Sequence, residues 1–261
     1  MVHSLLLGII QGLTEFLPIS SSGHLVIAQE IFGFEGSATL FDALLHFGTL
    51  LAVFIALREK IKNLVLGIFK GRKQDLETLG FLALASVPIG FAGFFADSLI
   101  ESAFKSLTTA GWGLIITGII LLTTLYRPSS VKDIEELSIA DAVYIGIAQV
   151  LALIPGVSRS GVTISTGLWR KVKGSSSAEF SFLLMIPAVL GATGLSIFKL
   201  FQGEFTGQVR PFAFFIGTFA ACITGIVSIK WLLSILKKGE FNLFGVYCLL
   251  LGSGVLLYTL F

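Results

Sequence analysis

Charged residues are scarce in this chain, and their scarcity excludes an ordinary soluble domain. Only 13% of the 261 residues are charged, against roughly 25% in a typical soluble protein, while 54% are hydrophobic. A bilayer core of about 30 Å is crossed by a helix of about 20 apolar residues. The composition therefore predicts an all-α integral membrane protein, a single membrane domain over residues 1–261.

Several common signals are missing as well. The only two cysteines, Cys222 and Cys248, lie in apolar runs and are interpreted as small hydrophobic residues, not as a disulfide or metal pair. The first residues lack the basic region of a cleavable signal peptide, so the spans themselves should drive insertion. The sequence contains no P-loop, zinc-protease motif or dinucleotide fingerprint. We expect no nucleic-acid partner.

The chain does contain long apolar stretches. Six are long enough to cross a bilayer: 40–57, 76–96, 110–126, 177–200, 211–236 and 243–260. Two further segments, 3–32 and 139–171, are apolar at both ends but broken by Pro, Gly and Ser, and each arm is shorter than a span. Irregular backbone at membrane depth survives only where protein or a water-filled cavity satisfies it. Both segments are predicted to be re-entrant helical hairpins.

The basic residues orient these segments. Residues 58–73 carry six Lys or Arg and are predicted to form a cytoplasmic loop. Counting spans from there places the first hairpin's entry on the outer face and the second hairpin's entry on the inner face. Residues 1–126 and 139–261 then each hold one hairpin and three spans. This is an inverted-topology repeat, in which broken segments meet at a substrate site near the midplane.

Both predicted hairpins carry one pattern, which we call the first hook (residues 8–23) and the second hook (residues 146–161). The two align without a gap at a spacing of 138 residues, from Gly8 to Gly146. The shared pairs are Gly8/Gly146, Ile9/Ile147, Gln11/Gln149, Leu13/Leu151, Ser20/Ser158, Ser22/Ser160 and Gly23/Gly161. Gly and Ser at each break favour the start of a half-helix, whose unpaired N–H groups and hydroxyls suit an anion.

Ionisable residues inside a membrane are costly and by default indicate function. In and directly beside the hooks these are Glu15, His24 and Arg159. The guanidinium of Arg159 suits phosphate oxygens, and Glu15 beside an anion site suits a cation ligand or a base that activates water. His24 can attack phosphorus or pass a proton. The hooks therefore predict phosphoryl chemistry inside the membrane, although Arg159 can also be only the buried ionic partner of Glu15.

Three other ionisable residues have a simpler interpretation. Asp42, His46 and Glu179 lie near the ends of predicted spans, where an interfacial position accounts for them. Asp42 and Glu179 occupy related places in the two halves and are kept as candidates that support the site.

The motifs "QGLTEFLPISSSGH" and "PGVSRSGVT", followed by "AEFSFLLMIPAVLGA", resemble the undecaprenyl-pyrophosphate phosphatase family of integral-membrane enzymes linked to bacitracin resistance. The resemblance covers nearly the whole chain. It implies removal of the terminal phosphate from a polyprenyl pyrophosphate, which recycles the lipid carrier of cell-wall synthesis. It also implies a divalent cation (Mg²⁺ or Ca²⁺) and a multi-pass protein of the cell membrane whose site is open to the outer face. A homodimer is a further possibility.

Carried over motif by motif, the resemblance assigns catalytic roles to Glu15, His24, Ser21 and Arg159. It places the family's arginine on Arg159 and the flanking hydroxyls on Ser158, Ser160 and Thr163. Together with Ser20 and Ser22, whose hydroxyls can orient phosphate, these are the predicted phosphate-binding residues. Some members have a second glutamate where this chain has Gln11, so Glu15 and Gln11 are the expected cation ligands. The attacking group can be His24, Ser21 or a water activated by Glu15, and of these we favour His24. An inverted-repeat transporter or flippase of a lipid phosphate or small anion is the alternative function.

Overall fold

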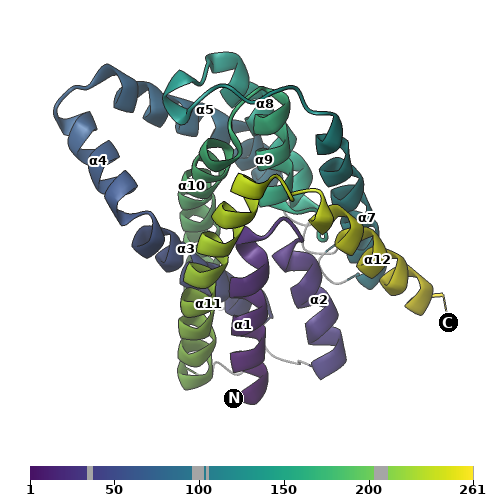
Figure 1. Cartoon of the computed structure of the whole chain (residues 1–261). Coiled ribbons are helices and arrows are strands. Elements are labelled where there is room, and N and C mark those ends of the chain that lie inside the picture. Colours follow the sequence, from purple (N-terminus) through teal and green to yellow (C-terminus); the bar gives the residue numbers. More distant parts are fainter. Residues whose placement is uncertain (34–37, 96–102, 104–105, 203–210, 261) are drawn as a thin grey trace.

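The computed structural model describes residues 1–33, 38–95, 103, 106–202 and 211–260, and these form helices joined by short connections (Figure 1). The first half contains α1 (Val2–Phe16), α2 (Ser21–Phe32), α3 (Ala38–Ala56), α4 (Arg58–Phe69), α5 (Lys73–Phe95) and α7 (Leu107–Thr123). The second half contains α8 (Ile139–Gln149), α9 (Arg159–Trp169), α10 (Gly174–Phe201), α11 (Pro211–Lys238) and α12 (Leu243–Tyr258). The only β pairing in the described residues is an isolated bridge between Lys132 and Val172. The all-α prediction is therefore confirmed.

A helix lies in each of the six stretches that were predicted to span the membrane, but these helices are not equally suited to do so. Within the described residues, α5, α7, α10 and α11 are long and apolar enough to cross a bilayer. α3 qualifies only together with α4, from which it is bent by 76°. α12 is shorter, with 16 residues. The structure thus supports four or five candidate spans and a multi-pass membrane protein.

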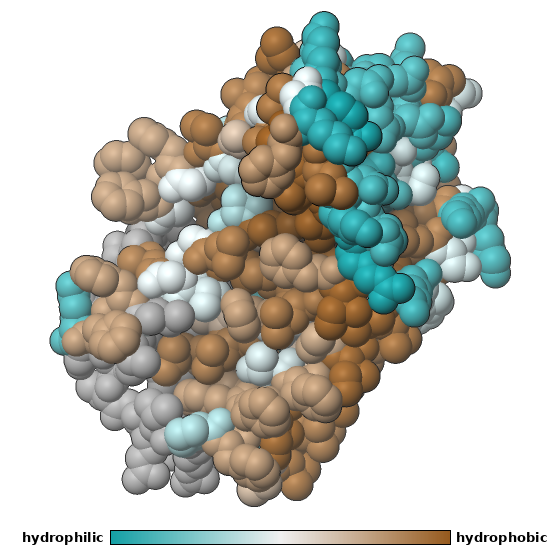
Figure 2. Space-filling view, turned by 90° about the vertical axis from the view of Figure 1, so that its left-hand side faces the viewer, coloured by the Kyte–Doolittle hydropathy of each residue, from teal (hydrophilic) through white to brown (hydrophobic). Residues whose placement is uncertain are grey.

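The prediction of a loop over residues 58–73 is wrong, because Arg58–Phe69 forms helix α4. The basic residues that suggested a loop are themselves good helix formers. Between them, Ile61 and Leu64 are spaced to share one helix face, and both pack against a buried cluster that includes Leu82 and Ile134. Figure 2, which views the side of the molecule where α4 lies, shows hydrophilic residues gathered in the upper part of a largely hydrophobic surface.

The helices of the two halves correspond in sequence spacing and pair crosswise. α2 begins at Ser21 and α9 at Arg159, while α5 begins at Lys73 and α11 at Pro211, so both pairs repeat the spacing of 138 residues. α1 packs on α11, as its counterpart α8 packs on α5. In the same way α3 packs on α11 and α10 on α5, while α3 meets α10 and α7 meets α12. Each half is therefore built around the other.

Two of the residues shared by the hooks allow this crosswise packing. A Cβ atom on Gly8 would lie 2.2 Å from the carbonyl oxygen of Gly217 in α11. A Cβ atom on Gly146 would lie 2.8 Å from the backbone of Ala85 in α5. Small residues of this kind let helix backbones approach closely in a membrane. The glycine that opens each hook thus sets the distance between α1 and α11 and between α8 and α5.

Candidate active site

The two hooks meet in the structure through two hydrogen bonds, one formed by each of the equivalent serines Ser22 and Ser160. The hydroxyl of Ser22 accepts a bond from the backbone N–H of Gly156 at 3.4 Å. The hydroxyl of Ser160, which is 138 residues after Ser22, donates to the carbonyl of Leu17 at 3.2 Å. Segments far apart in the sequence are therefore joined at the breaks of both hairpins.

Each hook ends at the start of a helix, as the sequence predicted, and a serine caps that start. Ser20 accepts a hydrogen bond from the N–H of Gly23 at 3.2 Å, and Ser158 accepts one from Gly161 at 3.1 Å. Both are N-caps, which satisfy one of the unpaired N–H groups of a first helical turn. In each hook the capping hydroxyl also lies 3.1 Å from the hydroxyl two residues on. These hydroxyls build the hooks; their contact with phosphate stays a prediction.

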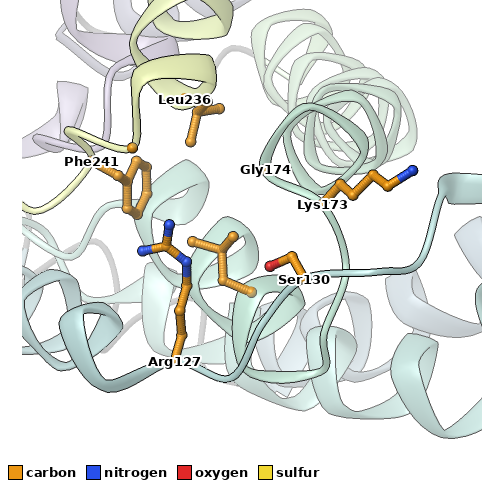
Figure 3. Close-up of a pocket in the computed structure, with 8 residues that line it drawn as sticks. Arg127, Ser130, Lys173, Gly174, Leu236 and Phe241 are labelled. Carbon is orange, nitrogen blue, oxygen red and sulfur yellow. The ribbon is translucent and has the colours of Figure 1, made fainter.

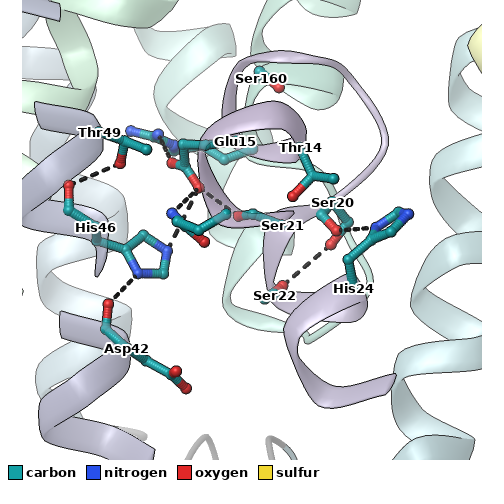
Figure 4. Close-up of polar contacts among 12 residues, drawn as sticks. Thr14, Glu15, Ser20, Ser21, Ser22, His24, Asp42, His46, Thr49 and Ser160 are labelled. Carbon is teal, nitrogen blue, oxygen red and sulfur yellow. Dashed lines mark hydrogen bonds and ion pairs between the residues drawn. The ribbon is translucent and has the colours of Figure 1, made fainter. Parts of the chain in front are cut away.

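Glu15 is the centre of the polar cluster where the hooks meet (Figure 4). Its side chain is 5% exposed, and the Nη2 atom of Arg159 donates to its Oε1 atom at 2.6 Å. The Oε2 atom accepts from the hydroxyl of Ser21 and from the Nε2 atom of Gln11. Ser21, Arg159 and Gln11, three of the predicted site residues, therefore surround the carboxylate of a fourth, Glu15.

His46 of α3 belongs to the same cluster, so its interpretation as a residue at the end of a span is wrong. Its Nε2 atom lies 3.5 Å from the Oε2 atom of Glu15, and its Nδ1 atom lies 2.8 Å from the carbonyl oxygen of Asp42. The available signal was that His46 is ionisable and lies within a very apolar stretch. It went unused because His46 lies outside the hooks and has no counterpart in the second half.

Asp42 and Glu179, the two candidates for supporting the site, lie in different parts of the structure. The carboxylate of Asp42 accepts a hydrogen bond from Gln29 of α2 at 2.7 Å, so it joins α2 to α3 one helical turn from His46. Glu179 instead forms an ion pair with Lys60 of α4 at 3.2 Å. Asp42 therefore supports the candidate site, and Glu179 stabilises the contact between α10 and α4.

His24 lies on α2 one turn after Ser21 and points away from Glu15 (Figure 4). Its Nδ1 atom is 2.7 Å from the carbonyl oxygen of Ser20. A carbonyl only accepts, so in the neutral ring the proton lies on Nδ1 and the lone pair on Nε2. Ser20 has a φ of 68°, a conformation that non-glycine residues rarely adopt. This strained residue supplies the carbonyl that fixes the imidazole.

Two buried polar atoms at the cluster have no hydrogen-bond partner among the described residues, the Nη1 atom of Arg159 and the Oε1 atom of Gln11. Buried polar atoms are nearly always paired in proteins, so a donor and an acceptor left free at one place are suited to bind a polar ligand. One is a cationic donor and the other is a neutral acceptor. Thr163, by contrast, is fully occupied by the carbonyl of Arg159 at 2.8 Å and the hydroxyl of Ser181 at 2.7 Å.

Two cavities lie elsewhere, and neither is lined by a described residue of a hook. One, of about 250 Å³, lies beside α4 and includes Lys60 and Glu135. The other, of about 200 Å³, includes Arg127, whose guanidinium points toward Phe241 (Figure 3). Lys173 lines it too, but its ammonium bonds to Asp133 at 2.6 Å, which lowers the pKa of that exposed carboxyl. The candidate site is therefore the place where the two hooks meet.

Comparison with known proteins agrees with the motifs. A family model described as "Bacitracin resistance protein BacA" matches residues 4–254. The chain belongs to the BacA family. Curated relatives named undecaprenyl-diphosphatase include the protein of Carboxydothermus hydrogenoformans, which is 42% identical over 97% of this chain and 95% of its own length. Those of Parabacteroides distasonis and Bacteroides thetaiotaomicron are each 37% identical over 99% of this chain, and over 98% and 99% of their own lengths. The BacA family is the one that the motifs in both hooks resemble.

Proposed function

We propose that this protein hydrolyses undecaprenyl diphosphate to undecaprenyl phosphate and inorganic phosphate, and so recycles the lipid carrier of cell-wall synthesis and confers bacitracin resistance. The observation that carries the proposal is the guanidinium of Arg159, held by Glu15 through Nη2 while Nη1 is buried and unpaired among the described residues. A planar guanidinium with a free donor in a membrane protein matches a phosphate oxygen. The names of the full-length relatives supply the substrate.

In this proposal the diphosphate is bound by residues at the place where the two hooks meet. The lipid tail lies among the apolar helices, and the diphosphate enters where the hooks meet. Arg159 donates to the terminal phosphate, and the N-termini of α2 and α9 add the positive ends of two helix dipoles. Positioning and charge stabilisation supply most of the rate in phosphoryl transfer. The ion pair with Glu15 holds the guanidinium in place before substrate arrives.

His24 is the attacking group in this proposal. The bond from its Nδ1 proton to Ser20 leaves the lone pair on Nε2, the nitrogen that must attack. Nε2 forms a bond to the terminal phosphorus, the bond from phosphorus to the bridging oxygen breaks, and undecaprenyl phosphate leaves with that electron pair. Water then attacks the phosphorus on His24, the P–N bond breaks, and inorganic phosphate is released. Ser21, hydrogen-bonded to Glu15, is the competing nucleophile.

The Glu15 cluster offers oxygen ligands to a divalent cation. The oxygen atoms of Glu15 and Gln11 are the kind that Mg²⁺ and Ca²⁺ prefer, and the Oε1 atom of Gln11 lacks any other partner among the described residues. No group of three or more His, Cys, Asp or Glu in the described part of the chain is placed to hold a metal. Glu15 and Gln11 would therefore hold the cation together with substrate phosphate oxygens, as Mg²⁺ commonly binds. When bound, it neutralises charge on the phosphates.

The crosswise pairing of equivalent helices supports the finer topology predicted from the sequence. In this proposal α1–α2 and α8–α9 are re-entrant hairpins that enter from opposite faces, and the site opens to the outer face.

In this topology, residues on the two sides of α7 differ in exposure to the cell exterior. We expect a membrane-impermeant thiol reagent added to cells to label Thr108→Cys but not Ser129→Cys. Both native cysteines are buried and give little background. Equal labelling of the two variants would contradict the topology.

Release of inorganic phosphate from undecaprenyl diphosphate by purified protein in detergent tests the function. We expect release with Mg²⁺ or Ca²⁺ present and its loss on addition of EDTA, restored by excess cation. Folded protein that releases no phosphate with any divalent cation would overturn the enzyme and favour the alternative, an inverted-repeat carrier of a lipid phosphate. Transport of labelled substrate in liposomes would then decide.

A further inference from the structure

A residue far from both hooks in the sequence contacts His24. The hydroxyl of Tyr247, in α12, lies 2.7 Å from the Nε2 atom of His24. Since the Nδ1 proton is donated to Ser20, Nε2 accepts and the tyrosine hydroxyl donates. The two rings are parallel within 6°, with centroids 5.7 Å apart. The imidazole is therefore held at both nitrogen atoms, by a carbonyl on one side and a phenol on the other.

The packing of α12 against α7 holds Tyr247 beside His24. A Cβ atom on Gly118 of α7 would lie 2.8 Å from the carbonyl oxygen of Gly245, and one on Gly252 would lie 2.8 Å from that of Gly111. These two close approaches fix α12 against α7 on both sides of Tyr247. The next residue, Cys248, is buried and its thiol lies 3.7 Å from the carbonyl oxygen of Pro18 in the first hook. Adjacent residues of α12 thus contact the break of the first hairpin.

A purely packing role for Tyr247 does not account for its hydroxyl. Its side chain is 43% exposed, so burial of the ring is incomplete. Its single polar atom lies at hydrogen-bonding distance from the one imidazole nitrogen whose lone pair is free. Because both nitrogen atoms are engaged, the ring can neither rotate about its own axis nor exchange its proton between Nδ1 and Nε2 without losing a bond.

We propose that Tyr247 is a positioning residue for the reaction, which holds His24 in the tautomer and orientation that direct the Nε2 lone pair toward the terminal phosphate. This inference rests on the proposed function. The imidazole keeps this orientation when the substrate phosphoryl group binds. The imidazole then already has the geometry for attack, and pre-orientation of this kind lowers the barrier of the chemical step without tightening ground-state binding.

The test compares Tyr247→Phe, which removes one oxygen atom and keeps the ring, with Tyr258→Phe on the same helix as the matched control. Tyr258 is 71% exposed and has no described contact with His24. We expect Tyr247→Phe to lower kcat about tenfold with KM unchanged, the size of one hydrogen bond. Tyr258→Phe should match the parent protein. Tyr247→Leu, which also removes the ring, should lose more activity than Tyr247→Phe.

Nitrogen-15 NMR of histidine-labelled protein gives a readout that does not depend on turnover. The chain has only three histidines, and His24→Gln identifies the His24 signals. We expect the parent protein to show a proton on Nδ1 and a hydrogen-bonded Nε2, and Tyr247→Phe to shift the Nε2 signal. An unchanged Nε2 signal, or an unchanged kcat in a protein that releases phosphate, would overturn the inference while the proposed function stands. If the signal shifts but the parent protein has no phosphatase activity, the contact between Tyr247 and His24 is confirmed. The proposed function, and with it the positioning role of Tyr247 in the reaction, is then overturned.

Discussion

Replacing Arg159 by alanine should lower kcat/KM for phosphate release by about 10³-fold or more. An arginine that stabilises charge in phosphoryl transfer contributes about 10³- to 10⁵-fold to kcat. The substitution removes the free Nη1 donor and also leaves Glu15 buried at the site with one cationic partner fewer. Initial rates over a range of substrate concentrations, measured on protein that elutes as a single species in detergent, give the value.

Two further variants separate the roles of Arg159. Arg159→Lys keeps a positive charge near Glu15 but loses the planar pair of donors, so its activity should fall between the parent and Arg159→Ala. Arg127→Ala is the matched control, because Arg127 lines a different cavity and has no described carboxylate partner. It should leave the rate unchanged. An Arg159→Ala protein within about threefold of the parent would reduce Arg159 to a structural partner of Glu15.

Substitution of His24 has the second large expected effect. His24→Ala and His24→Gln should each lower kcat by about 10³-fold or more, since loss of a nucleophile removes the covalent route entirely. Rapid acid-free quenching of the parent protein with substrate labelled in the terminal phosphate should trap label on the protein. A phosphohistidine is lost in acid and kept in alkali, whereas a phosphoserine behaves in the opposite way.

The chemical stability of that label decides between the two candidate nucleophiles. Label that survives acid and disappears in Ser21→Ala would transfer the nucleophilic role to Ser21, for which Glu15 is already a hydrogen-bonded base. His3→Ala serves as the control for histidine replacement. His3 stacks on Phe32 at the exposed end of the first hairpin, and its loss should not alter turnover.

The sequence predicted the part of the site that lies in or beside the two repeated hooks. The hooks were visible because polar residues inside an apolar chain are costly, and because the same order of residues recurs 138 positions later. From that repetition followed the breaks in both segments, a helix start among the Gly and Ser residues of each break, and the meeting of the two hooks. The structure agrees with each of these.

The residues that were missed occur once and contact the hooks only through the tertiary fold. His46 reaches Glu15 from α3, and Tyr247 reaches His24 across 223 positions of sequence. A single tyrosine in an apolar helix carries no periodic signal, so its role depends on how α12 crosses α7. Helix α4 was missed for a different reason, since its basic residues orient the chain and also favour a helix.

The crosswise packing of the two halves has a consequence for biosynthesis. α1 leaves the ribosome first, yet its packing partner α11 begins at Pro211, and Tyr247 follows later still. Until most of the chain has been made, the first hairpin therefore lacks its packing partner. The face of α1 that carries Gly8 stays uncovered, and Glu15 has no Arg159 to pair with. Contacts of such long sequence separation slow folding. The newly made protein acquires its complete candidate site only when its last helix is in place, so shortened chains that lack α11 and α12 carry an unfinished site.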